Sequence, residues 1–225
     1  MGKTGQPLLI GAVLTGIYLA LGWVALLTTG PNEVTLMWPA TGIVYGALLF
    51  FGPRWWPLPA ISVLLLHLTV SPVPPSFIPW SIAGNVVGAL AGVWFVRRFV
   101  PNLHGRFDVA AGAGLLCGGV VLGVTSGCFG ALGMVFSGQR EVDSLLSDVM
   151  RWAIGDIFGI IAVAPAVLLG LQRLLRKRGP TSAGRGAASR PEQRIWLGLM
   201  ALVVLAAAWM RSTEPTHALA MIGLP

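Results

Sequence analysis

Five side chains suited to ligand recognition lie in or beside long apolar stretches of the sequence: Trp38, His67, Asn85, Arg151 and Asp156. Ionisable groups inside hydrocarbon are costly and usually face a partner or a water-filled cavity. Asp156 and Asn85 are the clearest cases, because each lies about 10 Å inside its stretch at a helical rise of ~1.5 Å per residue. We therefore predict that these residues recognise a ligand or a proton.

A structural role is the alternative for the same side chains. Arg151 and Asp156 are five positions apart, about 140° around a helix, so they do not share a face. Each is expected to find a partner on another helix, with Asn85, His67 and Thr41 as candidates. On this interpretation Asp156 and Asn85 cap and cross-link kinked helices, satisfying backbone groups that proline and glycine leave free. The two roles are compatible.

The residue patterns of common catalytic and metal sites do not occur in the sequence. It contains no phosphate loop, zinc-ligand spacing, GxSxG elbow or catalytic carboxylate pair. Among its three histidines only His67 lies well inside an apolar stretch, whereas a bis-histidine haem site needs two. We expect no catalytic residue, no metal, no cofactor and no enzyme activity.

The composition indicates the elements that position the five residues. Of 225 residues, 55% are hydrophobic and 10% are charged, whereas a soluble domain carries about 25% charged residues. This excludes an ordinary soluble enzyme, a disordered tail and a disulfide scaffold. We predict a single all-α domain over residues 1–225, a polytopic integral membrane helical bundle with about seven complete spans and the start of an eighth. The predicted spans are 8–29, 34–52, 57–70, 77–96, 109–136, 149–172 and 195–210, with a stub from 218.

The basic residues predict the orientation of these spans. With a cytoplasmic amino terminus the inner connections hold most of the bases, and the outer ones hold Arg140 and Arg211. Cytoplasmic connections are enriched in Lys and Arg, so we predict a multi-pass protein of the bacterial inner membrane. The bases on the predicted inner side are Lys3, Arg54, Arg97, Arg98, Arg106, Arg173, Arg176, Lys177, Arg178, Arg185, Arg190 and Arg194.

Two segments of this arrangement suggest partners. Residues 173–194 form a predicted flexible basic linker, which anchors the topology or contacts anionic lipid; nucleic acid is not an expected partner. The span at 109–136 is rich in glycines at four-residue spacing, such as Gly119, Gly123 and Gly127. Such spacing lets two helix backbones approach closely. It predicts tight packing inside the bundle or, alternatively, a seam with a second copy or another membrane protein.

The polar residues all fall in the predicted outer half of the membrane. The second predicted span begins on the outer side with Trp38, Pro39 and Thr41. The inner half of the spans that carry these polar residues is almost purely apolar. We predict a polar cavity that opens to the periplasm.

Four segments, taken in order, resemble the MASE1 family of bacterial membrane sensory domains. They are WPATGIVYGALLFFGPRWWP (38–57), IAGNVVGALAGVWFVRRF (82–99), FDVAAGAG (107–114) and RWAIGDIFGIIAVAPAVLL (151–169). The resemblance implies about eight spans and a place at the amino terminus of a diguanylate cyclase, phosphodiesterase or sensor histidine kinase. The recurring positions of the family fall on Trp38, Pro39, Gly42, Gly84, Asn85, Asp108, Trp152, Gly155, Asp156, Gly159 and Pro165.

The chain departs from the family pattern at two places. His67 stands where an asparagine-like residue is expected, and residues 1–225 carry no output domain. The leading hypothesis is a sensor that reads a periplasmic or membrane-borne cue and passes it to a cytoplasmic output. The alternatives are a non-catalytic accessory subunit of a larger membrane complex and a substrate-binding transporter component.

Overall fold

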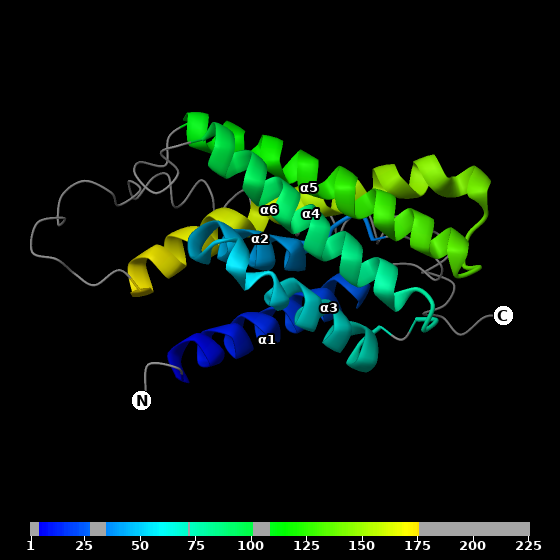
Figure 1. Ribbon diagram of the computed structural model, residues 1–225, viewed down its shortest axis with the longest axis horizontal. Coiled ribbons are helices and arrows are strands. Elements are labelled where there is room, and N and C mark those ends of the chain that lie inside the picture. Colours follow the sequence, from blue (N-terminus) through cyan, green and yellow to red (C-terminus); the bar gives the residue numbers. More distant parts are fainter. Residues whose placement is uncertain (1–4, 28–34, 72, 101–108, 176–225) are drawn as a thin grey trace, which may run out of the picture. The chain divides into compact units, whose positions relative to one another are not determined.

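Six α-helices and two short 3-10 helices follow one another along the described part of the chain (Figure 1). The computed structural model describes residues 5–27, 35–71, 73–100 and 109–175, all within one compact unit, Met1–Gly186. These residues form helices, turns and short irregular connections and contain no strand, in agreement with the all-α prediction. The elements are α1 (Gly5–Leu27), α2 (Pro39–Phe51), η1 (Pro53–Trp55), α3 (Pro57–Thr69), α4 (Ile78–Phe99), α5 (Val109–Phe136), η2 (Val142–Ser144) and α6 (Leu145–Leu175).

The expected count of seven complete spans needs correction. Within the described ranges, four helical segments are long and apolar enough to cross a membrane: Gln6–Leu27, Ile78–Phe99, Ala111–Phe136 and Val142–Leu175. Helices α2 and α3 have 13 residues each, or about 20 Å, which is shorter than the ~30 Å hydrocarbon core. The stretches predicted at 195–210 and from 218 lie outside the described residues.

Helix α2 is short because residues 35–38, directly before it, are not helical. Pro39 is the first residue of the helix, where its missing N–H leaves no donor unsatisfied. The backbone N–H of Trp38 instead donates to the carbonyl of Gly155 on α6, at 3.0 Å. Irregular backbone is tolerated at membrane depth where protein buries it. Residues 35–38 are thus irregular backbone in front of α2, held on α6 by the Trp38 N–H.

Small residues allow the helices to approach one another closely. An added Cβ on Gly42 would lie 2.5 Å from the Gly159 carbonyl oxygen of α6, and one on Gly92 would lie 2.6 Å from the Gly118 oxygen of α5. Most glycines of α5, from Gly118 to Gly133, face α4 or α6, as in the intrachain-packing interpretation. A seam with another protein stays a prediction, and it would have to use other faces of α5.

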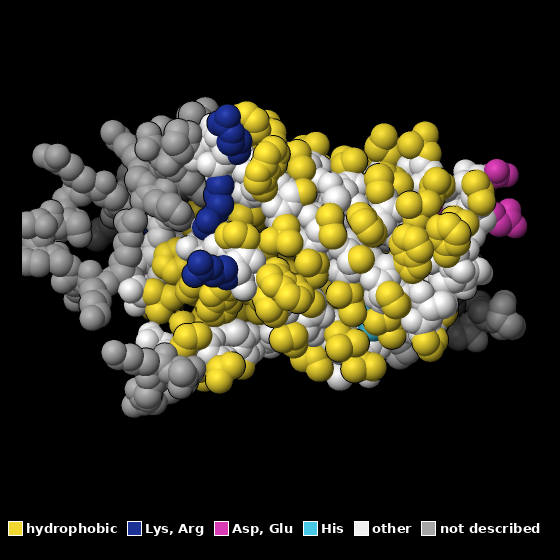
Figure 2. Space-filling model, viewed as in Figure 1, with side chains coloured by type: hydrophobic (Ala, Val, Ile, Leu, Met, Phe, Trp, Pro, Cys, Tyr) yellow, Lys and Arg dark blue, Asp and Glu magenta, His cyan; other side chains and the backbone are white. Residues whose placement is uncertain are grey.

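On the face that Figure 2 shows, Lys and Arg side chains lie toward one end of the bundle, and Asp and Glu side chains lie at the other. Arg54 lies in η1, and Arg97 and Arg98 lie in the last turn of α4. The exposed acids Glu141 and Asp143 belong to the connection between α5 and α6. Hydrophobic side chains cover much of the face between the two ends in the same view. Helix α6 continues to Leu175, so it includes the first three residues of the predicted linker; residues 176–194 lie outside the described part.

Candidate functional site

A cavity of about 340 Å³ lies between α1, α3, α4, α5, α6 and the non-helical segment 35–38 before α2. Four of the five predicted site residues line it: Trp38, His67, Asn85 and Asp156. The other lining residues are Tyr18, Leu26, Thr35, Val63, Leu66, Ser71, Val73, Phe77, Ser81, Met134, Gln139, Arg140 and Trp152. Residues more than 100 positions apart in the sequence thus meet around one space.

Asp156 is buried at one wall of this cavity, with 1% of its surface exposed. The Thr41 hydroxyl of α2 donates to its Oδ1 at 2.5 Å, and the Ser126 hydroxyl of α5 donates to its Oδ2. One carboxyl group therefore ties α2, α5 and α6 together. It lies about 16 Å along the helix from Leu145, deeper than the sequence predicts, because α6 begins four residues before the expected position 149.

Thr41 is the one of the three expected partners that bonds to Asp156. The Asn85 amide donates instead to the Ser81 carbonyl of its own helix at 2.9 Å. His67 Nδ1 lies 3.2 Å from the Ser71 carbonyl and its Nε2 lies 2.9 Å from the Ser81 hydroxyl. Because a carbonyl only accepts, Nδ1 carries the hydrogen in that contact. Cross-linking of helices is thus confirmed for Asp156, while Asn85 bonds within α4.

Sequence reasoning missed Ser126. It lies in the glycine-rich span, and Gly84 and Gly88 of α4 pack directly against it. A polar pair, Thr125 and Ser126, inside an apolar run was the available signal. Only the packing distinguishes them, since Thr125 bonds to the Val121 carbonyl of its own helix at 2.7 Å.

Arg151 does not belong to the cavity. It is exposed on the surface of α6, whereas its neighbour Trp152 lines the cavity. Successive residues of an α-helix point about 100° apart. The depth of Arg151 and Trp152 along the helix is therefore nearly the same, and it does not show which of the two side chains faces the cavity.

Aromatic side chains form much of the remaining lining. The indole N–H of Trp38, which can only donate, lies near the Tyr18 hydroxyl. The ring centroid of Phe77 lies 5.8 Å from that of His67 and 6.3 Å from that of Trp152.

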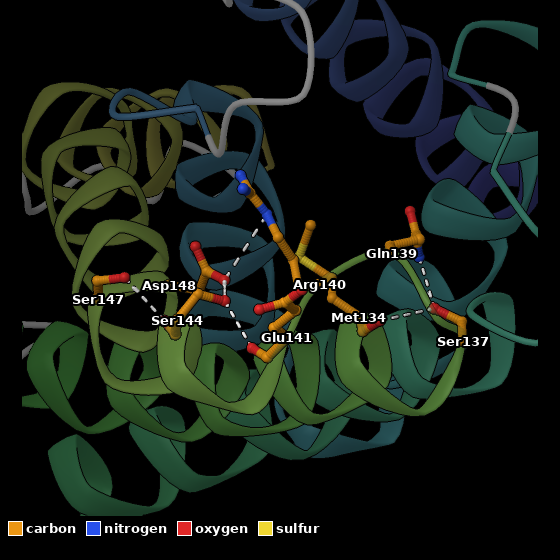
Figure 3. A network of polar contacts seen from close by, with 8 residues as sticks. All are labelled: Met134, Ser137, Gln139, Arg140, Glu141, Ser144, Ser147 and Asp148. Carbon is orange, nitrogen blue, oxygen red and sulfur yellow. Dashed lines mark hydrogen bonds and ion pairs between the residues drawn. The ribbon is translucent and has the colours of Figure 1, made fainter.

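A second polar network closes the connection between α5 and α6 (Figure 3). Arg140 Nε lies 3.8 Å from Oδ2 of the buried Asp148, and the Ser144 hydroxyl donates to the same oxygen at 2.7 Å. Gln139 donates from Nε2 to the Ser137 hydroxyl at 2.6 Å. Arg140 and Gln139 also line the cavity, so it reaches the loops at the end of the bundle that carries the acids.

Comparison with known protein families identifies the chain. A family model described as MASE1 matches residues 7–225, which is nearly the whole chain. No curated protein and no solved structure matches the chain.

Proposed function

Because the chain belongs to the MASE1 family of membrane-associated sensory domains, we propose that it is the input domain of a bacterial signalling protein. In this proposal the cavity holds a periplasmic or membrane-borne cue. The protein lies in the inner membrane with a cytoplasmic amino terminus, and the output is a cytoplasmic cyclase, phosphodiesterase or kinase activity.

The bonding of Asp156 supports this proposal. Its carboxyl group lines the cavity and also holds α2 and α5 against α6. A cue that contacts Asp156 therefore competes with the bonds that set the packing of three helices. Such a cue binds two packings with different affinity, which is the condition for shifting their populations. Helix α6 runs on toward the predicted cytoplasmic linker and is the route by which the shift leaves the bundle.

An output assay tests this function. The whole chain is joined to a diguanylate cyclase reporter, and cyclic di-GMP is measured in cells. We expect Asp156→Asn and Asn85→Ala to change the basal output by about fivefold or more at normal protein level. Cys128→Ala, on an exposed face of α5, is the matched control and leaves the output unchanged. Unchanged output in both site variants contradicts the proposal.

Labelling of single cysteines tests the orientation. In a Cys117→Ala, Cys128→Ala background, Val142→Cys marks the connection between α5 and α6, and Trp56→Cys marks the one between α2 and α3; both positions are exposed. A membrane-impermeant maleimide is expected to label position 142 from the periplasmic side and position 56 only after lysis. The reverse pattern contradicts a cytoplasmic amino terminus.

A carrier function is a second candidate, favoured by one observation. The chain before α2, residues 35–38, is not helical and lies beside the cavity. Helices interrupted by such irregular backbone commonly form the substrate sites of transporters. Counterflow in proteoliposomes distinguishes a carrier from a sensor, because a sensor binds its cue without moving it across the bilayer.

A further inference from the structure

We propose that the cavity binds small organic ammonium ions, with Asp156 as the counter-charge and the aromatic lining as the surface that receives the alkyl groups. This inference rests on the proposed function, since the same cavity holds the cue, and it names the chemical class of that cue.

The charge of Asp156 is the first step of the argument. Both of its carboxyl oxygens accept a hydrogen bond from a hydroxyl group, as the two oxygens of an ionised carboxylate can, and neutral hydroxyls supply no positive charge to balance it. Among the residues that the structure describes, no cationic side chain lies within ion-pair distance of Asp156. A buried charge is expensive unless it is paired. A cation in the cavity supplies the missing partner.

The aromatic lining is the second step. Tyr18, Trp38, Phe77 and Trp152 line the cavity together with Asp156. The faces of such rings carry partial negative charge and attract alkylammonium groups, which is how aromatic cages recognise quaternary ammonium ligands. The volume of about 340 Å³ is at the lower end for small-molecule sites. Aromatic rings beside one carboxylate favour a compact cation over a neutral molecule.

The position of Arg140 is the third step. It precedes the turn into α6 and pairs with Asp148, which lies eight residues before Asp156, or about 12 Å along the helix. The positive charge therefore lies near the loops, away from the wall that holds Asp156. An anionic ligand would instead be drawn to Arg140, and this difference makes the two ligand classes separable.

Three probes of nearly identical shape test the ligand class. Choline is the cation, 3,3-dimethylbutan-1-ol is its neutral isostere and 3,3-dimethylbutanoate is the anion. Binding of labelled choline to the full chain is measured by equilibrium dialysis in a maltoside detergent, because choline lipids would compete. We expect choline to bind, and the neutral and anionic probes to displace it at least about tenfold less well, or ~1.4 kcal/mol.

Variants assign the binding to this cavity. Asp156→Asn is expected to weaken choline binding about tenfold or more, and Phe77→Leu to weaken it without removing any charge. Asp143→Asn, an exposed acid outside the cavity, is the matched control and leaves the affinity unchanged. If either cavity variant folds poorly, the comparison of the three probes on the unaltered chain still decides the ligand class.

The possible outcomes separate this inference from the proposed function. Equal binding of the neutral probe, stronger binding of the anion, or no binding of choline overturns the ammonium proposal, while the output assay still judges the sensory role. Choline binding that Asp156→Asn and Phe77→Leu leave intact places the ammonium site elsewhere and overturns the proposal too. Selective choline binding with an output insensitive to Asp156 and Asn85 supports the ligand class and contradicts the sensor.

Discussion

Replacing Gly159 with alanine is expected to lower the free energy of unfolding by about 3 kcal/mol. An added Cβ would lie 1.9 Å from the carbonyl oxygen of Trp38 and 2.6 Å from its carbonyl carbon. The added methyl group would collide with the backbone of the segment before α2, and backbone cannot rotate away as a side chain can. The methyl group must therefore displace this segment from α6 and break the hydrogen bond between the Trp38 N–H and the Gly155 carbonyl.

Gly170→Ala is the matched control for this prediction. It lies on the same helix, and an added Cβ there meets no atom within 4 Å. Its expected effect ranges from none to a gain of about 1 kcal/mol, because alanine favours the helix over glycine. Unfolding of both variants is followed by titration with sodium dodecyl sulfate in mixed micelles. Equal stability of the two would show that the segment before α2 does not pack on α6.

Asp156→Ala is expected to destabilise the fold by about 2–4 kcal/mol, because it leaves the hydroxyls of Thr41 and Ser126 without their charged acceptor. The second of these hydroxyls retains a long contact, 3.4 Å, with the Gly123 carbonyl of its own helix. The substitution also removes the hydrogen bonds that join α2 and α5 to α6. Asp143→Ala removes an exposed carboxylate near the start of the same helix, and its effect is expected to stay within about 0.5 kcal/mol.

A double-mutant cycle checks that the three side chains act as one unit. Thr41→Val and Ser126→Ala are each measured alone and combined with Asp156→Ala, by the same unfolding titration. We expect the combined losses to be clearly smaller than the sums of the single losses, since residues in one hydrogen-bond network couple. Strict additivity would mean that Asp156 does not link α2 and α5 to α6.

The helices were predictable from hydropathy, but the number of complete spans was not. Six of the predicted apolar stretches contain a helix. The stretch at 34–52 contains only 13 helical residues, because Pro39 starts the helix and residues 35–38 are irregular backbone. Hydropathy measures how apolar a segment is, and it does not distinguish lipid-exposed helix from irregular backbone that a neighbouring helix buries.

The candidate site was partly predictable, since depth along a helix follows from sequence position alone. Trp38, His67, Asn85 and Asp156 were selected by that argument, and all four line the cavity. The same argument selected Arg151, whose side chain lies on the exposed surface of α6 and not in the cavity. Depth does not specify the direction of a side chain around its helix.

By itself, the sequence determined the helical class, the membrane environment and the family. These properties depend on composition and on local residue patterns. The tertiary structure alone decided that Ser126 and Thr41 share the carboxyl group of Asp156, and that Asn85 bonds within α4. Those pairings depend on which faces of the helices meet. That choice is made by glycine contacts between segments more than 30 residues apart, such as Gly84 with Ser126 and Gly159 with Trp38.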